Sequence, residues 1–179
     1  MGRYKFKKLK MGIILINSSV FKDNRGSFLE IYDKKEFEKA GIKCNFIQSM
    51  ISISKSGVMR GLHFQDSKYS QAKLVRCLSG KVWEVAVDVR KNSKTFGQYV
   101  AVELSGKNMA AIFVPRGFAL GFVVLSKENA ILLYNVDNDY SPIHASGVRW
   151  NDKNINIRWP ITPKIISEKD RNLKELNYL

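Results

Sequence analysis

The sequence predicts an all-β protein, a sandwich or barrel of the jelly-roll type. In the clearest strand, residues 81–90, apolar side chains occupy positions 83, 85, 87 and 89, whereas Glu84, Asp88 and Arg90 lie on the opposite face. A period of two is typical of a strand that buries one face. Many short runs of this kind follow at regular spacing and only one internal helix is credible, which favours a jelly-roll.

The remaining elements follow from composition along the chain. Strands are expected at residues 12–16, 27–32, 46–53, 72–78, 98–104, 111–114, 121–125 and 131–136. Residues 79–80, 105–108 and 115–117 are rich in turn formers and separate them. A helix is expected at 34–40 before Gly41, and a helical turn at 167–172 with Ser167 as N-cap. No repeat or linker divides the chain, so residues 1–179 are expected to form a single domain with a basic segment at 1–10.

The charge balance is unusual: 30 Lys and Arg face 16 Asp and Glu, a formal net charge of +14. Such a surplus fits a solvated basic tail, or binding to nucleic acid, an anionic membrane or a phosphorylated small molecule. No nucleic-acid-binding motif accompanies it, so nucleic acid is not expected as a partner. Without a membrane span or secretion signal, and with isolated Cys44 and Cys77 expected to be reduced and buried, we predict a cytoplasmic protein with no membrane partner.

One segment, residues 59–65, combines His63 with Arg60, and Lys73 follows ten residues after the histidine. A histidine titrates near neutral pH and can take or give a proton in a pocket. The two cations are suited to holding an anionic substrate or stabilising developing negative charge. A lone histidine on an apolar strand is more often packed than catalytic. The combination nevertheless indicates acid–base chemistry on a phosphorylated ligand inside a small barrel.

Metal chemistry is not expected from this sequence. His63 and His144 are the only two histidines, and they lie far apart. Zinc and iron sites usually need more nitrogen or sulfur ligands than this. We therefore predict a reaction that uses no metal and no other cofactor.

Seven segments, taken in order, resemble the motifs of one family, the dTDP-4-dehydrorhamnose 3,5-epimerases. They are residues 23–30 (DNRGSFLE), 57–65 (GVMRGLHFQ), 71–76 (QAKLVR), 80–90 (GKVWEVAVDVR), 114–119 (VPRGFA), 148–152 (VRWND) and 167–170 (SEKD). The resemblance implies a cupin-type jelly-roll β-barrel with a few short helices, working as a homodimer. It also implies a cofactor-free enzyme of dTDP-rhamnose synthesis, which inverts carbons 3 and 5 of a nucleotide-linked 4-keto-6-deoxy sugar.

The resemblance assigns the catalytic groups. A proton beside a ketone can be removed if the enolate is stabilised, and its return from the opposite face inverts the carbon. His63 matches the family's base and Tyr134 the acid on the other face. Asp170 would orient the imidazole and favour its cationic form, and Lys73 would stand near the keto oxygen.

Further positions match those that hold the nucleotide and the diphosphate. Arginine suits phosphate because its planar fork gives paired, charge-assisted hydrogen bonds. The matching residues are Arg25, Phe28, Glu30, Gln48 and Arg60, with Lys169 as an additional cation and Tyr140 as a second tyrosine near Tyr134.

Two positions depart from the family pattern. Leu120 stands where the family usually has histidine, and Met50 where it usually has asparagine. Each replaces a polar group with an apolar one, which weakens binding of a polar ligand unless the ligand has changed too. Drift with local repacking is one explanation. The other is an altered nucleotide, a deoxygenated sugar, or inversion at one carbon only.

Two alternatives to the double epimerase therefore stay open. One is an epimerase that inverts only carbon 3 or carbon 5 of a related dTDP-, CDP- or GDP-linked keto sugar. The other is a cupin that binds sugar nucleotides without turning them over. The set of His63, Lys73, Tyr134 and Asp170 favours catalysis, because binding alone needs no matched base and acid.

Overall fold

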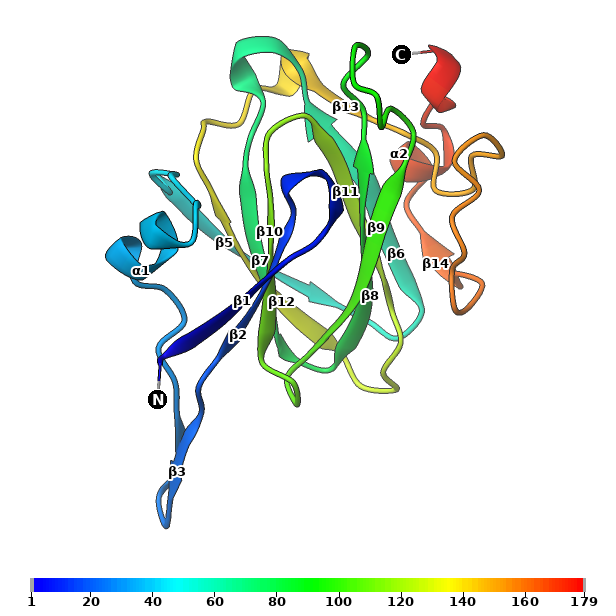
Figure 1. The fold of residues 1–179 in the computed structure, drawn as a ribbon. Coiled ribbons are helices and arrows are strands. Elements are labelled where there is room, and N and C mark those ends of the chain that lie inside the picture. Colours follow the sequence, from blue (N-terminus) through cyan, green and yellow to red (C-terminus); the bar gives the residue numbers. More distant parts are fainter. Residues whose placement is uncertain (1, 179) are drawn as a thin grey trace.

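The computed structural model describes residues 2–178 and shows two antiparallel sheets that face each other around one barrel (Figure 1). The first sheet has the strand order β1 (Tyr4–Lys8), β2 (Ile14–Ser18), β10 (Ala110–Val114), β7 (Lys73–Ser79), β12 (Ala130–Val136), β5 (Gln48–Ser54). The second has the order β13 (Ala145–Gly147), β6 (Val58–Gln65), β11 (Phe118–Val124), β8 (Lys81–Asp88), β9 (Tyr99–Ser105), and β14 (Ile165–Ile166) joins β6 in parallel. The predicted jelly-roll fold is confirmed.

Most predicted strands are confirmed, with ends displaced by a few residues, but the strand at 27–32 is wrong beyond Phe28. Residues there form a small hairpin, β3 (Phe21–Asp23) with β4 (Gly26–Phe28), whose last pair is Phe21 with Phe28. Beyond the hairpin, the carboxylate of Glu30 pairs with the guanidinium of Arg3 at 2.9 Å. The hairpin extends away from the barrel (Figure 1).

The basic N-terminal segment is not the solvated tail that its charge suggested. Residues 4–8 form β1, which pairs with β2 at the edge of the first sheet. Tyr4 and Phe6 each place a ring 5.3 Å from the ring of Phe37, whereas Lys5 and Lys7 are exposed on the alternate positions. Lysines on an edge strand discourage pairing with other chains.

Three hydrophobic clusters explain the layers. The first lies between the sheets and takes side chains such as Val75 and Ile112 from one and Phe122 from the other. The second packs Phe37 of α1 (Lys34–Lys39) against the outer face of the first sheet. In the third, the C-terminal segment covers the outer face of the second sheet, for example with Ile155. Strand β8 is therefore buried on both faces, which corrects the expectation of one buried face.

The two short helices form where the sequence predicts them. Asp33 caps α1 by accepting a hydrogen bond from the backbone of Glu36. Ser167 likewise caps α2 (Glu168–Arg171) through the backbone N–H of Asp170. Single 3-10 turns occur at Lys10–Gly12, Ser67–Tyr69, Pro142–His144 and Leu176–Tyr178. Within residues 2–178, no helix is both long and apolar enough to cross a membrane.

Candidate active site

A cavity of about 470 Å³ opens between the two sheets and brings the predicted catalytic residues together. Its walls come from both sheets and from α2. The lining residues are Met50, Ile51, Ser52, Arg60, His63, Lys73, Glu84, Leu120, Gly121, Phe122, Tyr134, Ser167, Lys169 and Asp170.

His63 and Asp170 form a dyad although they are far apart in sequence. His63 Nε2 lies 2.7 Å from the Asp170 carboxylate, whose other oxygen accepts the N–H of Gly61 at 3.2 Å. Burial works to raise the pKa of Asp170, but the hydrogen bonds from His63 and Gly61 outweigh it and hold that pKa below its ordinary value. The carboxylate is therefore charged at neutral pH. Because Nε2 is occupied by Asp170, the other ring nitrogen of His63 is available to a ligand.

Glycine at position 61 makes the contact between strands possible. Its φ is +119°, and a Cβ atom there would lie 2.5 Å from the Cα of Gly121 on the neighbouring strand. Only glycine fits this approach of β6 to β11. The same backbone conformation directs the Gly61 N–H at Asp170.

Lys73 enters the cavity from β7, on the sheet opposite His63. Its ammonium donates to the backbone carbonyl of His63 at 3.4 Å. Burial lowers the pKa of Lys73 to about 8, and the negative charge of Glu84 opposes that fall. The lysine is thus a cation near neutrality, held beside the histidine.

Tyr134 comes from β12 and stands on the sheet that faces His63. Burial raises the pKa of its hydroxyl well above the ordinary value, and the nearby charge of Glu84 adds to the effect. Tyr134 therefore keeps its proton at neutral pH and is a potential proton donor. A ligand between the sheets would meet His63 on one side and Tyr134 on the other.

The two departures from the family pattern lie directly beside this pair. Leu120 is the cross-strand neighbour of His63, and Met50 is the cross-strand neighbour of Tyr134. Both line the cavity, Leu120 being 5% exposed and Met50 40% exposed. Each proton-transfer candidate is thus flanked by an apolar side chain, at the two positions where the resemblance leads us to expect a polar one.

Four predicted binding residues lie outside this cavity. Arg25 is at the tip of the hairpin, paired with Asp23 at 2.6 Å, and Phe28 is 71% exposed on the same hairpin. Glu30 accepts hydrogen bonds from Arg3 and from the hydroxyl of Tyr4. Gln48 is exposed at the start of β5.

Arg60 and Lys169 do line the cavity, and Tyr140 is next to it. The Arg60 guanidinium donates to Ser54 Oγ at 2.9 Å, which orients it across the cavity wall. Tyr140 borders a smaller adjoining space of about 210 Å³ that also touches His63, Lys73 and Lys169. Lys73 and Lys169 therefore border both spaces, whereas Arg60 lines only the larger one and Tyr140 only the smaller one.

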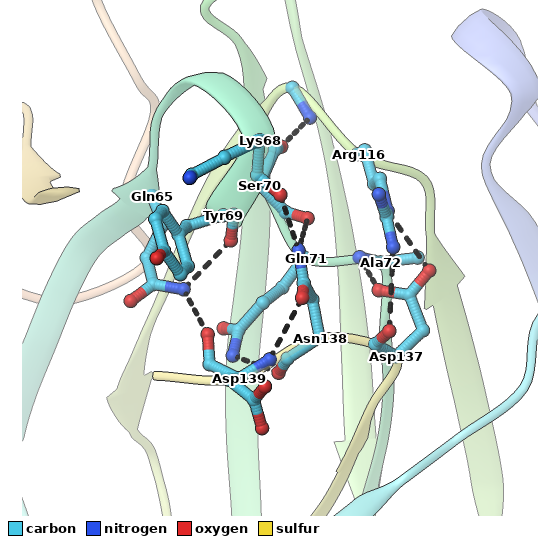
Figure 2. A network of polar contacts seen from close by, with 11 residues as sticks. Gln65, Lys68, Tyr69, Ser70, Gln71, Ala72, Arg116, Asp137, Asn138 and Asp139 are labelled. Carbon is cyan, nitrogen blue, oxygen red and sulfur yellow. Dashed lines mark hydrogen bonds and ion pairs between the residues drawn. The ribbon is translucent and has the colours of Figure 1, made fainter. Parts of the chain in front are cut away.

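The loops at this end of the barrel are held together by side-chain amides (Figure 2). Gln71 donates to the backbone carbonyl of Asn138 at 2.8 Å, and Asn138 donates to that of Lys68 at 2.6 Å. Gln65 donates to the carbonyl of Asp139 at 2.9 Å, next to Tyr140. Such amides satisfy loop backbone groups that no strand pairs. The network fixes the loop that carries Tyr140.

Sequence reasoning missed Glu84. Its side chain is fully buried in the cavity, and burial raises its pKa to about 8 despite the opposing charge of Lys73. The sequence did contain a signal, which is a carboxylate within the valine-rich strand. Burying such a group costs free energy unless it is paired or has a functional role. Within residues 2–178, no three His, Cys, Asp or Glu side chains are grouped so that they could hold a metal ion.

The chain is similar in sequence and in fold to known proteins. The family model described as dTDP-4-dehydrorhamnose 3,5-epimerase matches residues 8–178. A Shigella flexneri protein of that name is 47% identical over 161 residues, 89% of this chain and 88% of the relative. The Elizabethkingia anophelis enzyme of that name has a crystal structure with a TM-score of 0.92 at 45% identity, covering 99% of this chain and 98% of that one. A Legionella pneumophila 3,5-epimerase in complex with dTDP-4-keto-L-rhamnose has a TM-score of 0.93 at 38% identity, covering 97% and 93%.

Proposed function

Because the chain belongs to the dTDP-4-dehydrorhamnose 3,5-epimerase family, we propose that it inverts carbons 3 and 5 of a dTDP-linked 4-keto-6-deoxy sugar. The observation that carries the proposal is the cavity with the His63–Asp170 dyad on one sheet and Tyr134 on the other. Lys73, which lines the same cavity, supplies the positive charge that an enolate needs. The chain forms a single catalytic domain.

Each inversion has two proton transfers. His63 takes the proton from the carbon beside the ketone, and the electrons of the C–H bond move to the ketone oxygen, which Lys73 stabilises as an enolate. Tyr134 then gives its hydroxyl proton to the opposite face of that carbon. The tyrosine regains a proton from solvent and His63 releases one, which resets the site. The cationic imidazole formed in the first step is held by the charged Asp170.

Solvent exchange tests this function directly. The protein is incubated in heavy water with dTDP-4-keto-6-deoxyglucose, and the product is analysed by mass spectrometry and proton NMR. Deuterium at both carbons 3 and 5, with the rhamno product, is the expected result. No exchange with this sugar or with CDP- and GDP-linked keto sugars would contradict an epimerase and favour a cupin that only binds sugar nucleotides.

A second candidate is an epimerase of a single carbon, on this or a related sugar nucleotide. Leu120 beside His63 and Met50 beside Tyr134 favour it, because the lost polar groups would have bound sugar hydroxyls. Deuterium at one carbon only, in the same experiment, would select this candidate.

We also infer that the protein works as a homodimer. The hairpin exposes Phe21 and Phe28, 56% and 71% accessible, and edge strand β5 exposes Ile51 and Ile53, 62% and 60% accessible. Exposed apolar side chains grouped on a hairpin and on a sheet edge are typical of an interface. In such a dimer, the hairpin of the second copy would bring its Arg25 to the cavity of the first copy, a cavity that Arg25 does not reach within its own chain.

A cytoplasmic site of action fits the two free cysteines, Cys44 and Cys77.

A further inference from the structure

Glu84 is a buried acid for which the chain provides no partner. Its side chain is 0% exposed in the middle of β8, between Phe122 of β11 and Val102 of β9 in the register of the sheet. Within residues 2–178, neither carboxyl oxygen has a hydrogen-bond partner. A polar group in this state is costly to the fold, by about 1–3 kcal/mol. Since Glu84 lines the reaction cavity, a functional role is the natural explanation.

Glu84 interacts electrostatically with Lys73. The two enter the cavity from opposite sheets, β8 and β7, and no ion pair within 4.0 Å joins them among the described residues. They act on each other through the low dielectric of the barrel interior. The other titratable groups that line a space together with Lys73 are His63, Arg60, Tyr134, Tyr140, Lys169 and Asp170.

We propose that Glu84 is a positioning residue of the epimerase, which keeps Lys73 charged against the ketone oxygen and thereby sets the upper pH at which the enzyme works. It does not touch the reacting carbon. It acts through Lys73, whose ammonium must be protonated to stabilise an enolate. This inference rests on the function proposed above, and it makes Glu84 the side chain that sets the upper end of the pH range of the epimerase.

The direction of the effect follows from the charges. Burial lowers the pKa of Lys73 to about 8 and raises that of Glu84 to about 8, and each group pulls the other back toward its ordinary value. The carboxylate that forms when Glu84 loses its proton favours retention of the proton on Lys73. Without Glu84, burial alone acts on Lys73 and its charge is lost at lower pH.

The test compares Glu84→Gln and Glu84→Asp with a matched control, Glu103→Gln, an exposed carboxylate of the neighbouring β9 that pairs with Lys81. Lysine ¹³Cε NMR of the protein without substrate follows the titration of Lys73. In Glu84→Gln this titration, and the alkaline limb of kcat/KM, are expected to move down by about one pH unit, the size of shift that a nearby opposite charge produces. Glu84→Asp and Glu103→Gln are expected to leave both near the wild-type position.

An unchanged Lys73 titration in folded Glu84→Gln would overturn the inference while leaving the epimerase reaction untouched. Conversely, a shifted titration in a protein that turns over no keto sugar would overturn the proposed function and, with it, the catalytic part of this role. Should Glu84→Gln fail to fold, Lys73→Met gives the reciprocal measurement. Its loss of charge is expected to raise the pKa of Glu84, followed by glutamate ¹³Cδ NMR, and no rise would contradict the coupling.

Discussion

At the scale of single residues, the dyad makes the sharpest prediction. Replacing Asp170 with Asn removes the charge that holds His63 and stabilises its cation. We expect kcat to fall by at least about a hundredfold, the lower end of what a positioned acid–base group contributes, with KM little changed. Steady-state kinetics of the epimerisation measures both. Glu168→Gln, on the same short helix but outside the cavity, is the control and should keep wild-type rates.

Glu84 also predicts how stability depends on pH. Its pKa is raised from 4.5 to about 8 on folding, so between these values the folded protein holds a proton that the unfolded chain has released. The contribution of Glu84 to stability is therefore greatest below about pH 4.5 and is lost as pH rises toward 8. Glu84→Gln lacks this loss. Thermal unfolding at pH 5 and pH 7.5 should show a smaller decrease in Tm for the variant than for the wild type, and equal decreases would contradict the burial of an acid there.

Substitution of Leu120 distinguishes the two explanations for its apolar side chain, which are sequence drift and a changed substrate. Since it neighbours His63 in the sheet, Leu120→His places a polar group at the wall beside the base. If the substrate has changed, the variant should gain activity on dTDP-4-keto-6-deoxyglucose relative to other keto sugars by about tenfold or more, because unpaired polar groups discriminate strongly. Parallel rate measurements on the sugar panel give this ratio. A ratio equal to that of the wild type would mean local repacking without a functional consequence.

At the scale of elements, the amide network predicts how the loops beside the smaller space next to His63 are held. Asn138→Ala removes the hydrogen bonds to the carbonyls of Lys68 and Ser70, each bond contributing about 1 kcal/mol. Both loops should open more often, so hydrogen exchange should rise at residues 66–72 and 137–141, and KM should rise severalfold. Asn108→Ala, which loosens a turn between β9 and β10, is the comparison and should leave KM unchanged. Unchanged exchange in Asn138→Ala would show that the backbone alone fixes these loops.

The strands could be predicted because alternation is a local property that survives folding. The period-two pattern around Trp83 located β8, and Ser167 located α2 through its cap. What could not be predicted depends on the second layer. Whether β8 buries one face or two is decided by the sheet opposite, so Glu84 was expected on an outer face and instead lies in the cavity. Likewise, the many lysines of residues 4–8 suggested a solvated tail and not strand β1. The apolar side chains of this strand are covered by Phe37, which comes from a helix elsewhere in the chain.

The candidate site also has a part that could be predicted from the sequence and a part that could not. His63, Lys73, Tyr134 and Asp170 were named from motifs, and the barrel brings them to one cavity. Motifs name residues but do not say which chain supplies them. Arg25 belongs to the same pattern and lies on a hairpin that points away from its own barrel. The separation of Arg25 from the cavity of its own chain is the reason for testing the proposed dimer.

At the scale of the whole molecule, the net charge of +14 opposes self-association, whereas the exposed apolar side chains of the hairpin and β5 favour it. Added salt screens the repulsion and leaves the apolar contact, so the dimer should tighten with ionic strength. Sedimentation at low and moderate salt measures this. A protein that is monomeric under both conditions would contradict the dimer.

Mixed dimers then show whether the hairpin completes the partner's site. His63→Ala and Arg25→Ala should each be nearly inactive alone. If each site combines His63 of one copy with Arg25 of the other, a hybrid has one intact site, so random mixing should restore about a quarter of wild-type activity. Mixing His63→Ala with Tyr134→Phe is the matched control, because both residues line one cavity within a single chain and no hybrid site can be intact. Hybrids that form, as native mass spectrometry would show, but recover no activity with Arg25→Ala would mean that the hairpin acts only within its own subunit.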